Sequence, residues 1–488
     1  MSSNRDSIAQ QLHGKLNEFI NTLSEVKGAQ PSVHDTEEQV WDGMLALGRD
    51  LMQLRFEACS EAEVIQDTLE VDGASYAYQR DSERAYVSLF GPVRVKRAYY
   101  LNAERGGWFP LDAALSLPER SYSDSVQERL SELNVWMPQD QSLKLVERWL
   151  GLKIPKGSLQ RSASEQAVYV AAYYQQQPDS AAEVEDSILV VTADGKGIPM
   201  TRADSPPLQA RRSKGQKKTA KKEAIVTAVY NVAPYVRDRY ALIDALLPES
   251  AEDCPSTDER PVPSSKQTFG TLDGKTAALD TLAHHVAQRD NAAVVHRVAL
   301  SDGSLALQQQ LLAHFPAFCL VLDIIHVVEH LWAAATVCCG ETSPTRLPWM
   351  RQALAWLLDD HLDDLLQLLA AQAHDRPAPQ QTVLVQLGAY LRRNRPYMDY
   401  QRYLTLGWPI GTGVVEGACR HLVKDRFEQA GMRWSKAGAQ ALLDLRSVAF
   451  NDDWLDFQRF RRRQSHLARY HLPYPDTLPA ILALEAAA

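Results

Sequence analysis

Three short apolar segments of this chain each end in an aspartate. Residues 188–192 form an apolar and β-branched run that leads to Asp194, and similar runs lead to Asp302 and Asp323. Runs of this length and composition are typical of buried strands. In an open α/β sheet, groups at the carboxyl ends of neighbouring strands converge on one crevice. The pattern therefore predicts an α/β fold in which three carboxylates meet at one edge of the sheet.

Carboxylates that converge repel one another unless a cation neutralises them, and a divalent metal is the usual solution. The alternative is that the three aspartates are unrelated, because a single aspartate at a strand end commonly caps a turn. The repetition of the arrangement favours a metal site.

A fourth carboxylate stands in a segment with helical periodicity that begins at Gly411 and Thr412, where Thr412 is a plausible N-cap. Glu416 lies in the first turn, where the helix dipole favours an acid. Arg420 and Lys424 follow at i+4 and i+8, which would place both on the face of Glu416. This face suits a polyanionic substrate, although a solvated salt bridge is the simpler alternative. The expected apolar side consists of Val415, Cys419, Leu422 and Val423.

Several motifs occur in a specific order. They are Ala-Asp-Gly-Lys-Gly-Ile-Pro-Met at 193–200, Asp-Ile-Ile-His at 323–326, Gly-Thr-Gly-Val-Val-Glu-Gly-Ala-Cys-Arg at 411–420 and Gly-Met-Arg-Trp-Ser at 431–435. In these motifs the chain resembles bacterial insertion-sequence transposases of the Kra group, in the Mutator-like Asp-Asp-Glu (DDE) superfamily. The resemblance extends over residues 91–454 and is closest from Asp194 onward.

The resemblance implies a ribonuclease H-like catalytic core with a large helical insertion, preceded by a mainly helical DNA-binding region that contains a β-hairpin. Asp194 on the first strand, Asp302 after the fourth and Glu416 on a late helix would be the catalytic metal ligands. Asp323 and His326 match an accessory motif of the superfamily. Asp323 is also the alternative to Asp302 as second ligand, and His326 would orient a ligand, contact a phosphate or serve as a structural imidazole.

Hard oxygen ligands suit Mg²⁺ or Mn²⁺, and two such ions clamp the attacking and leaving oxygens of a phosphoryl displacement. The activity implied by the resemblance is that of a transposase, which cuts the terminal inverted repeats of its element and joins them to target DNA. The same chemistry would serve a resolvase-like nuclease that cuts without joining.

Six regions are expected along the chain. They are an N-terminal helical and β-hairpin region (1–118), a helix-turn-helix-like DNA-binding region (119–182), the first part of the core (183–326), a helical insertion (327–409), the rest of the core with the Glu416 helix (410–450) and a basic C-terminal tail (451–488).

The net charge of −9 does not by itself indicate a DNA partner, but basic residues are clustered. The loop after the first catalytic strand carries seven basic and no acidic residues, which predicts a phosphate clamp. In the helix-turn-helix-like region, Lys156, Gln160 and Arg161 are the expected DNA contacts. The basic residues of the loop are Arg211, Arg212, Lys214, Lys217, Lys218, Lys221 and Lys222. Further candidates are Arg392, Arg393 and Arg395, and Arg459, Arg461, Arg462 and Arg463.

Composition adds little to the functional prediction. The six cysteines show no spacing typical of zinc sites, and the sequence has no apolar run long enough to span a bilayer. We therefore expect a cytoplasmic, nucleoid-associated protein that acts on DNA as a homodimer or higher oligomer, without a membrane partner.

Parts of the sequence also fit two other functions. His326, Glu329 and His330 match the His-x-x-Glu-His pattern of inverted zinc peptidases, with Glu416 as a possible third ligand. This reading leaves Asp194, Asp302 and the basic clusters unexplained. A domesticated DNA-binding protein that has lost catalysis is the other alternative, and the complete set of acidic residues argues against it.

Overall fold

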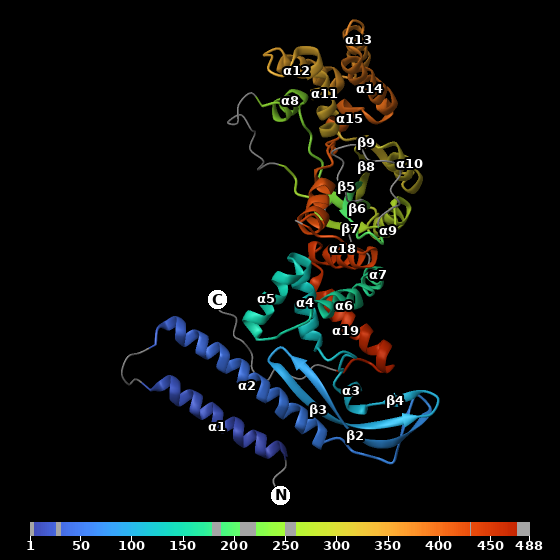
Figure 1. The fold of residues 1–488 in the computed structure, drawn as a ribbon. Coiled ribbons are helices and arrows are strands. Elements are labelled where there is room, and N and C mark those ends of the chain that lie inside the picture. Colours follow the sequence, from blue (N-terminus) through green and yellow to red (C-terminus); the bar gives the residue numbers. More distant parts are fainter. Residues whose placement is uncertain are drawn as a thin grey trace. The chain divides into compact units, whose positions relative to one another are not determined.

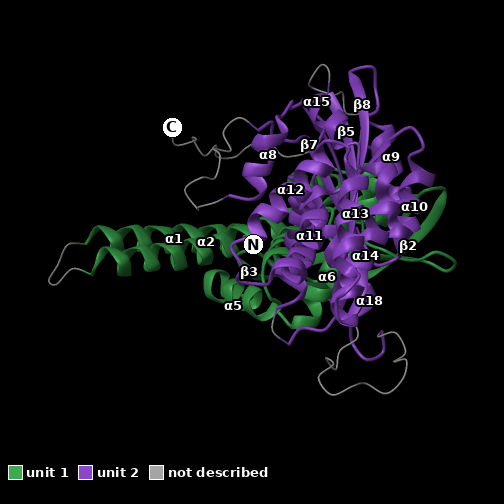
Figure 2. Ribbon diagram, turned by 90° about the horizontal axis from the view of Figure 1, so that it is seen from above, with its two compact units in different colours: residues 1–175, 453–488 green, residues 176–452 purple. Residues whose placement is uncertain are grey.

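The computed structural model describes residues 4–25, 31–177, 187–204, 221–248, 260–429 and 431–475. The fold is mixed α/β, and the chain divides into two compact units. Unit 1 contains residues 1–175 and 453–488, and unit 2 contains residues 176–452 (Figure 2). In the described parts of the chain, every helix is too short or too polar to cross a membrane.

Unit 1 begins with two long helices and a four-stranded antiparallel sheet, in which each strand pairs with the next along the chain. Ser32 caps the second helix by accepting a hydrogen bond from the backbone NH of Asp35. The elements are α1 (Asn4–Ser24), α2 (Val33–Glu61), β1 (Thr68–Val71), β2 (Ala74–Ser88), β3 (Gly91–Asn102), β4 (Gly106–Trp108) and α3 (Pro110–Ala114) (Figure 1).

Three helices and the turn between the last two form a separate apolar cluster in unit 1, built on Val126, Leu130, Val146 and Leu159. Gly151 ends the middle helix with a φ of 64°, a conformation that glycine adopts without a steric penalty. The helices are α4 (Asp124–Trp136), α5 (Gln139–Leu150) and α6 (Lys156–Ala167), followed by α7 (Val170–Gln175). The unit is completed from the far end of the chain by α19 (Trp454–Tyr470).

Unit 2 is built around a five-stranded sheet with the order β7-β6-β5-β8-β9. The pairs β5/β6 and β6/β7 are antiparallel, whereas β5/β8 and β8/β9 are parallel. The strands are β5 (Ser187–Pro199), β6 (Lys221–Val232), β7 (Ser264–Thr271), β8 (Val294–Ser301) and β9 (Cys319–Leu322).

Alternate residues of the central strands enter two different apolar clusters, as the twofold period of a strand requires. Leu189 and Val191 pack with α9 (Lys275–Ala287) and α10 (Leu305–His314) on one face. Ile188 and Val190 pack in the larger cluster on the other face. The helices of that face include α8 (Arg239–Leu246), α11 (Ile324–Cys339), α12 (Arg346–Leu358), α13 (Leu362–Ala373), α14 (Ala378–Asn394) and α15 (Tyr400–Thr405), and a short 3₁₀ turn, η2 (Arg395–Tyr397), separates the last two.

The region expected as a helical insertion is therefore helical, and it packs against the sheet face that Ile188 and Val190 line. After it, the chain forms α16 (Gly413–Ala418), the π-helix η3 (Cys419–Lys424), α17 (Asp425–Phe427) and α18 (Lys436–Phe450). The last of these lies against β7, where a Cβ added at Gly270 would stand 3.2 Å from the Leu443 side chain.

Candidate active site

Asp194, Asp302 and Asp323 lie in one row across three neighbouring parallel strands. Thr192 pairs with Leu300 between β5 and β8, and Ser301 pairs with Leu322 between β8 and β9. Continued to the aspartates, these registers place Asp194 level with Asp302 and Asp302 level with Asp323. Adjacent strands are about 4.8 Å apart, so the backbones of neighbouring aspartates in this row lie close together.

Strand alternation also places the three aspartates on the same side of the sheet. Asp194 shares the parity of Ile188 and Val190, Asp302 shares that of Val298 and Leu300, and Asp323 shares that of Val321. These five apolar residues belong to the larger apolar cluster. The backbone therefore brings the three aspartates to one edge of the sheet, and the convergence of their carboxylates stays a prediction.

Asp194 lies within β5 and not at its end, which differs from the expectation. Pairing with β8 stops at Thr192, but β6 continues the antiparallel ladder through Asp194 to Pro199. The half-buried Asp194 carboxylate accepts hydrogen bonds from the backbone NH of Gly195 at 2.6 Å and from the Cys419 thiol at 3.4 Å. Burial and the nearby Asp194 charge both raise the pKa of Cys419, so the thiol stays protonated and remains a donor.

Asp302 lies in a loop that α14 holds in place. The Tyr390 hydroxyl donates to the Asp302 carbonyl at 3.1 Å, and the Arg393 guanidinium donates to the Gly303 carbonyl at 2.6 Å. Gly303 has a φ of 90°, and a Cβ there would stand 2.6 Å from the Tyr390 hydroxyl oxygen. The Asp302 carboxylate itself is half-buried and accepts the backbone NH of Ser304 at 2.8 Å through Oδ1.

Asp323 is fully buried and caps α11, because its Oδ1 accepts the backbone NH of Ile325 at 3.0 Å. Its Oδ2 accepts from His326 Nδ1 at 2.5 Å and from the Thr412 hydroxyl at 2.6 Å. A buried carboxylate is costly unless it is well hydrogen-bonded, and these contacts use both of its oxygens.

Thr412 connects this buried aspartate to Glu416. Its hydroxyl lies 2.6 Å from Asp323 Oδ2 and 2.8 Å from Glu416 Oε1. Although Thr412 stands at the N-cap position of α16, its side chain caps no backbone NH and faces the two carboxylates. A hydroxyl has one proton to donate, so the second carboxylate contact requires another proton or a cation.

The helix that carries Glu416 crosses the row of aspartates. Thr412, before its first turn, contacts Asp323, and Cys419, three residues after Glu416, contacts Asp194. The backbone changes from α to π geometry at 419–424, and Glu416, Arg420 and Lys424 are all exposed. The expected placement of Arg420 and Lys424 on the face of Glu416 stays a prediction. Val415, Cys419, Leu422 and Val423 are buried, as expected.

The hydrogen bond that His326 donates to Asp323 raises the pKa of the imidazole to about 9, and the charges of Asp323, Asp302 and Glu329 act in the same direction. The imidazole is therefore protonated at neutral pH and forms an ion pair with Asp323 across 2.5 Å. This contact offsets part of the negative charge that the aspartate brings into the site.

Ligand atoms of Asp323, His326 and Glu416 all lie within 4.8 Å of one another. Over the described residues this is the group of three found with metal-binding proximity, and Asp194 and Asp302 stand outside it. The acids in and beside this group are Asp194, Asp302, Asp323 and Glu416, and their carboxylate oxygens suit Mg²⁺ or Mn²⁺. The unmatched second contact of the Thr412 hydroxyl also fits a cation beside Glu416.

The expected DNA-binding residues are placed as follows. Lys156, Gln160 and Arg161 are exposed on α6, where Lys156 pairs with Asp140 at 2.9 Å and Gln160 contacts Gln139 at 3.2 Å. Lys221 and Lys222 open β6, and Arg420 and Lys424 are exposed in η3. The predictions for Arg211, Arg212, Lys214, Lys217 and Lys218 fall outside the described residues.

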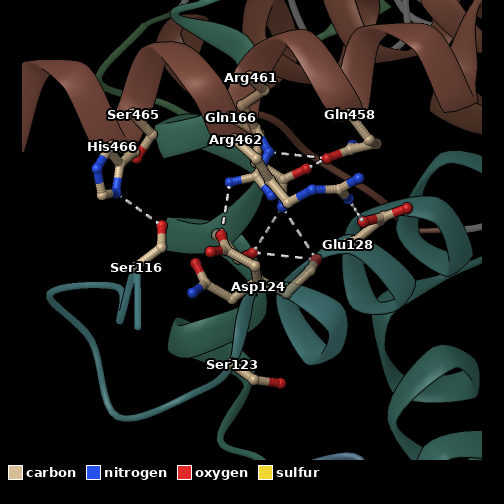
Figure 3. A network of polar contacts seen from close by, with 12 residues as sticks. Ser116, Ser123, Asp124, Glu128, Gln166, Gln458, Arg461, Arg462, Ser465 and His466 are labelled. Atoms are coloured by element: carbon tan, nitrogen blue, oxygen red, sulfur yellow. Dashed lines mark hydrogen bonds and ion pairs between the residues drawn. The ribbon is translucent and has the colours of Figure 1, made fainter. Parts of the chain in front are cut away.

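Arg461 and Arg462, two of the predicted phosphate contacts, form ion pairs within unit 1 (Figure 3). Arg461 of α19 pairs with Asp124 of α4 at 2.9 Å, and the neighbouring Arg462 pairs with Glu128 at 2.7 Å. Only 5% of the Arg461 side chain is exposed. The 454–470 part of the expected C-terminal tail is thus a helix that packs on α4.

Tyr390 and Lys196 lie near the acids and were not expected there, and Thr412 was expected only as an N-cap. Lys196 follows Asp194 by two residues on β5 and shares its face of the strand. Its positive charge lowers the pKa of Cys419, which places it near the site. The position of Thr412 four residues before Glu416 is the one sequence signal that could have identified it.

The ligand set of the alternative zinc peptidase is not brought together. His330 packs its ring on Tyr390, with ring centroids 4.6 Å apart, and the group that contains His326 includes neither Glu329 nor His330. The positive charge of His326 and burial lower the pKa of His330. Among the described residues, the geometry therefore gives this alternative no support.

Comparison with known proteins gave no match, either to a protein-family model or to a curated protein.

Proposed function

We propose that this protein is a DNA transposase of the Asp-Asp-Glu type, which cuts the ends of an insertion sequence and joins them to target DNA. The observation that carries the proposal is the row formed by Asp194 on β5 and by Asp302 and Asp323 directly after β8 and β9, crossed by the helix of Glu416. The motifs quoted above give the same assignment from the sequence.

The sheet topology supports a ribonuclease H-like core. In chain order, the first three strands of unit 2 form an antiparallel meander, and the fourth and fifth strands add in parallel beside the first. Asp194 lies on the first strand, Asp302 directly follows the fourth, and Glu416 lies on a helix after the sheet is complete. These are the positions that the proposed fold assigns to its acids.

Asp194, Asp302 and Glu416 are the proposed metal ligands. Asp302 has a half-buried carboxylate whose observed contact is made through Oδ1, and Glu416 is exposed. Asp323 is fully buried, and both of its oxygens accept hydrogen bonds from protein groups. We therefore assign Asp323 a positioning role, in which it orients Thr412 and, through it, Glu416.

Two Mg²⁺ or Mn²⁺ ions held by these residues would activate water or a DNA 3′-hydroxyl and stabilise the leaving oxygen. The protein's own contribution is to fix the carboxylates before the metal arrives. Asp194 is oriented by Gly195 and Cys419, and the Asp302 loop is clamped by Tyr390 and Arg393. Preorganised ligands of this kind reduce the reorganisation required during the reaction.

The test is cleavage and joining of DNA that carries the element's own ends, by purified protein with Mg²⁺, Mn²⁺, Zn²⁺ or chelator. Activity with Mg²⁺ or Mn²⁺ should disappear in Asp194→Ala, Asp302→Ala and Glu416→Ala, while binding to the same DNA persists. Cleavage without joining would identify a nuclease. Binding without cleavage under every metal would support a DNA-binding protein that has lost catalysis.

A further inference from the structure

The first two helices of unit 1 form an antiparallel pair (Figure 1), with contacts at several points along their length. The backbone NH of Arg5 donates to Glu61 at 3.0 Å, and Lys15 pairs with Asp50 at 2.6 Å. Further along, the Phe19 ring lies so close to Gly43 that a Cβ there would stand 2.4 Å from it. One face of each helix is therefore used for the pair itself.

Each helix also carries a straight stripe of large apolar side chains that are exposed. With 100° of rotation per residue, Val33, Val40, Met44 and Leu51 of α2 fall within about 40° of one another. Leu16, Ile20 and Leu23 of α1 form a similar stripe. The exposed fractions are 76% for Val33, 36% for Val40, 56% for Met44, 53% for Leu51, 40% for Leu16, 53% for Ile20 and 40% for Leu23.

The two stripes lie on the same side of the helix pair. Viewed along the axis of α1, the centre of its stripe is rotated by about 70° from the contact residue Phe19. On α2 the stripe is rotated by about 80° from the contact residue Gly43, in the same direction about its own helix axis. Since the helices are antiparallel, equal rotations from facing contact residues lead to one common side. The two helices thus present these apolar side chains on one common side, where Glu37 also lines the groove beside Val40.

We propose that this apolar face of α1 and α2 is the interface for a second copy of the chain, in which the two α2 helices pack antiparallel about a twofold axis. The spacing of the α2 stripe is 7, 4 and 7 residues, which is symmetric about position 42. An antiparallel twofold pair therefore sets Val33 against Leu51 of the second copy and Val40 against Met44. A twofold interface requires this self-complementarity.

The size of the face also fits a pair of identical chains. The seven side chains together expose on the order of 600 Å², more than the few hundred Å² of contiguous apolar surface usual on a monomer. This approaches the roughly 800 Å² that each partner contributes to a standard interface. Val33, Val40 and Met44 also line an open groove of about 460 Å³, which Leu51 of the second copy would enter.

The first experiment measures the mass of the full chain in solution by light scattering, without DNA, at micromolar concentration. We expect a dimer that becomes a monomer in Val40→Glu/Met44→Glu. Ile20→Glu should also weaken the dimer, whereas the matched control Asn21→Glu adds the same charge at the adjacent exposed position and leaves the dimer intact. Since all of these side chains are exposed, the circular dichroism and the melting temperature of the monomeric variants should match those of the wild type within a few degrees.

The second experiment tests the orientation. Mixing Val33→Cys protein with Leu51→Cys protein and oxidising should give a cross-linked dimer, and neither variant alone should give it above the wild-type background. A wild-type monomer, a dimer unaffected by Val40→Glu/Met44→Glu, or cross-linking by Val33→Cys alone would each overturn the proposal. The readouts are mass and cross-linking without DNA, so they do not depend on the proposed transposase activity.

Discussion

The Thr412 hydroxyl lies 2.6 Å from the buried carboxylate of Asp323, a residue that precedes it by 89 positions. Ile324, next to Asp323, donates its backbone NH to the carbonyl of Ile410 at 2.9 Å. The start of α11 and the segment that leads into α16 are thus joined by a backbone and a side-chain hydrogen bond. Glu416 depends on this junction for its position.

Thr412→Val should reduce DNA cleavage by about 10- to 100-fold, the range typical of residues that orient a metal ligand. Valine keeps the volume but cannot bond Asp323 or Glu416. The measurement is the cleavage rate as a function of Mn²⁺ concentration, and we expect a higher metal requirement. Thr412→Ser, which retains the hydroxyl, should stay close to wild type. Full activity in the valine variant would remove Thr412 from the site.

Asp302→Asn and Asp323→Asn should differ in their effects on stability. Asp302→Asn removes a half-buried charge and should abolish cleavage while it changes the free energy of unfolding little. Asp323→Asn breaks a buried ion pair with His326 and should cost about 3 kcal/mol, the usual effect of losing one partner of such a pair. Urea denaturation of both proteins gives the comparison. The opposite order would make Asp302 the structural residue.

Gly303→Ala should destabilise unit 2 by about 1–3 kcal/mol and reduce cleavage. The φ of 90° is unfavourable for alanine, and the new methyl group would collide with Tyr390. Gly340→Ala is a suitable control, since Gly340 has a φ of 95° but no atom within 4 Å of the added Cβ. Both variants should lose stability because alanine is strained at these positive φ values. Loss of cleavage only in Gly303→Ala would show that the Tyr390 contact positions the Asp302 loop.

Arg461→Met should destabilise unit 1 by about 3 kcal/mol, because it leaves Asp124 without its buried partner. Arg463→Met removes the same charge from an exposed position two residues later and should change stability by less than about 0.5 kcal/mol. Thermal unfolding of the two proteins is the measurement. Equal stability would mean that the pair between α19 and α4 contributes little.

Stability should fall as the pH is lowered from about 6.5 to 4, with a contribution from His285. Burial lowers the pKa of this imidazole to about 4 from 6.5, aided by His284 and Arg289. The unfolded chain therefore takes up a proton in this window before the folded chain does, and folding loses up to about 3 kcal/mol. His285→Phe retains an aromatic ring that can stack on Phe269. In this variant, the free energy of unfolding measured by urea denaturation should depend less on pH in this range. An unchanged profile would contradict the assignment.

The central strands and the acids could be predicted because the signal is local. The apolar run at 188–192 and the Asp-Gly pair at 302–303 are sufficient to place two strands and their carboxylates. The central parts of β5 and β6 are buried on both faces, so they appear as continuous apolar segments that sequence inspection detects.

The features that the sequence did not reveal depend on contacts between distant segments. The extension of β5 through Asp194 requires β6 as its partner, and the clamp on Gly303 requires Tyr390, 87 positions later along the sequence. The π geometry at 419–424 was not anticipated, and the structure gives us no physical account of why it begins at Cys419. The sequence predicts Arg461 as a DNA contact because its partner in the structure, Asp124, is 337 residues away and cannot be identified from local sequence.

The return of the chain to unit 1 has a consequence for biosynthesis. Helix α19 is made after all of unit 2, yet it supplies Arg461 and Gln458 to the buried polar network of α4 and α6. A nascent polypeptide on the ribosome therefore holds α4 and α6 without their final neighbour until translation has passed Tyr470. Premature termination between the end of unit 2 and that point would release a complete sheet of unit 2 together with an unfinished N-terminal unit.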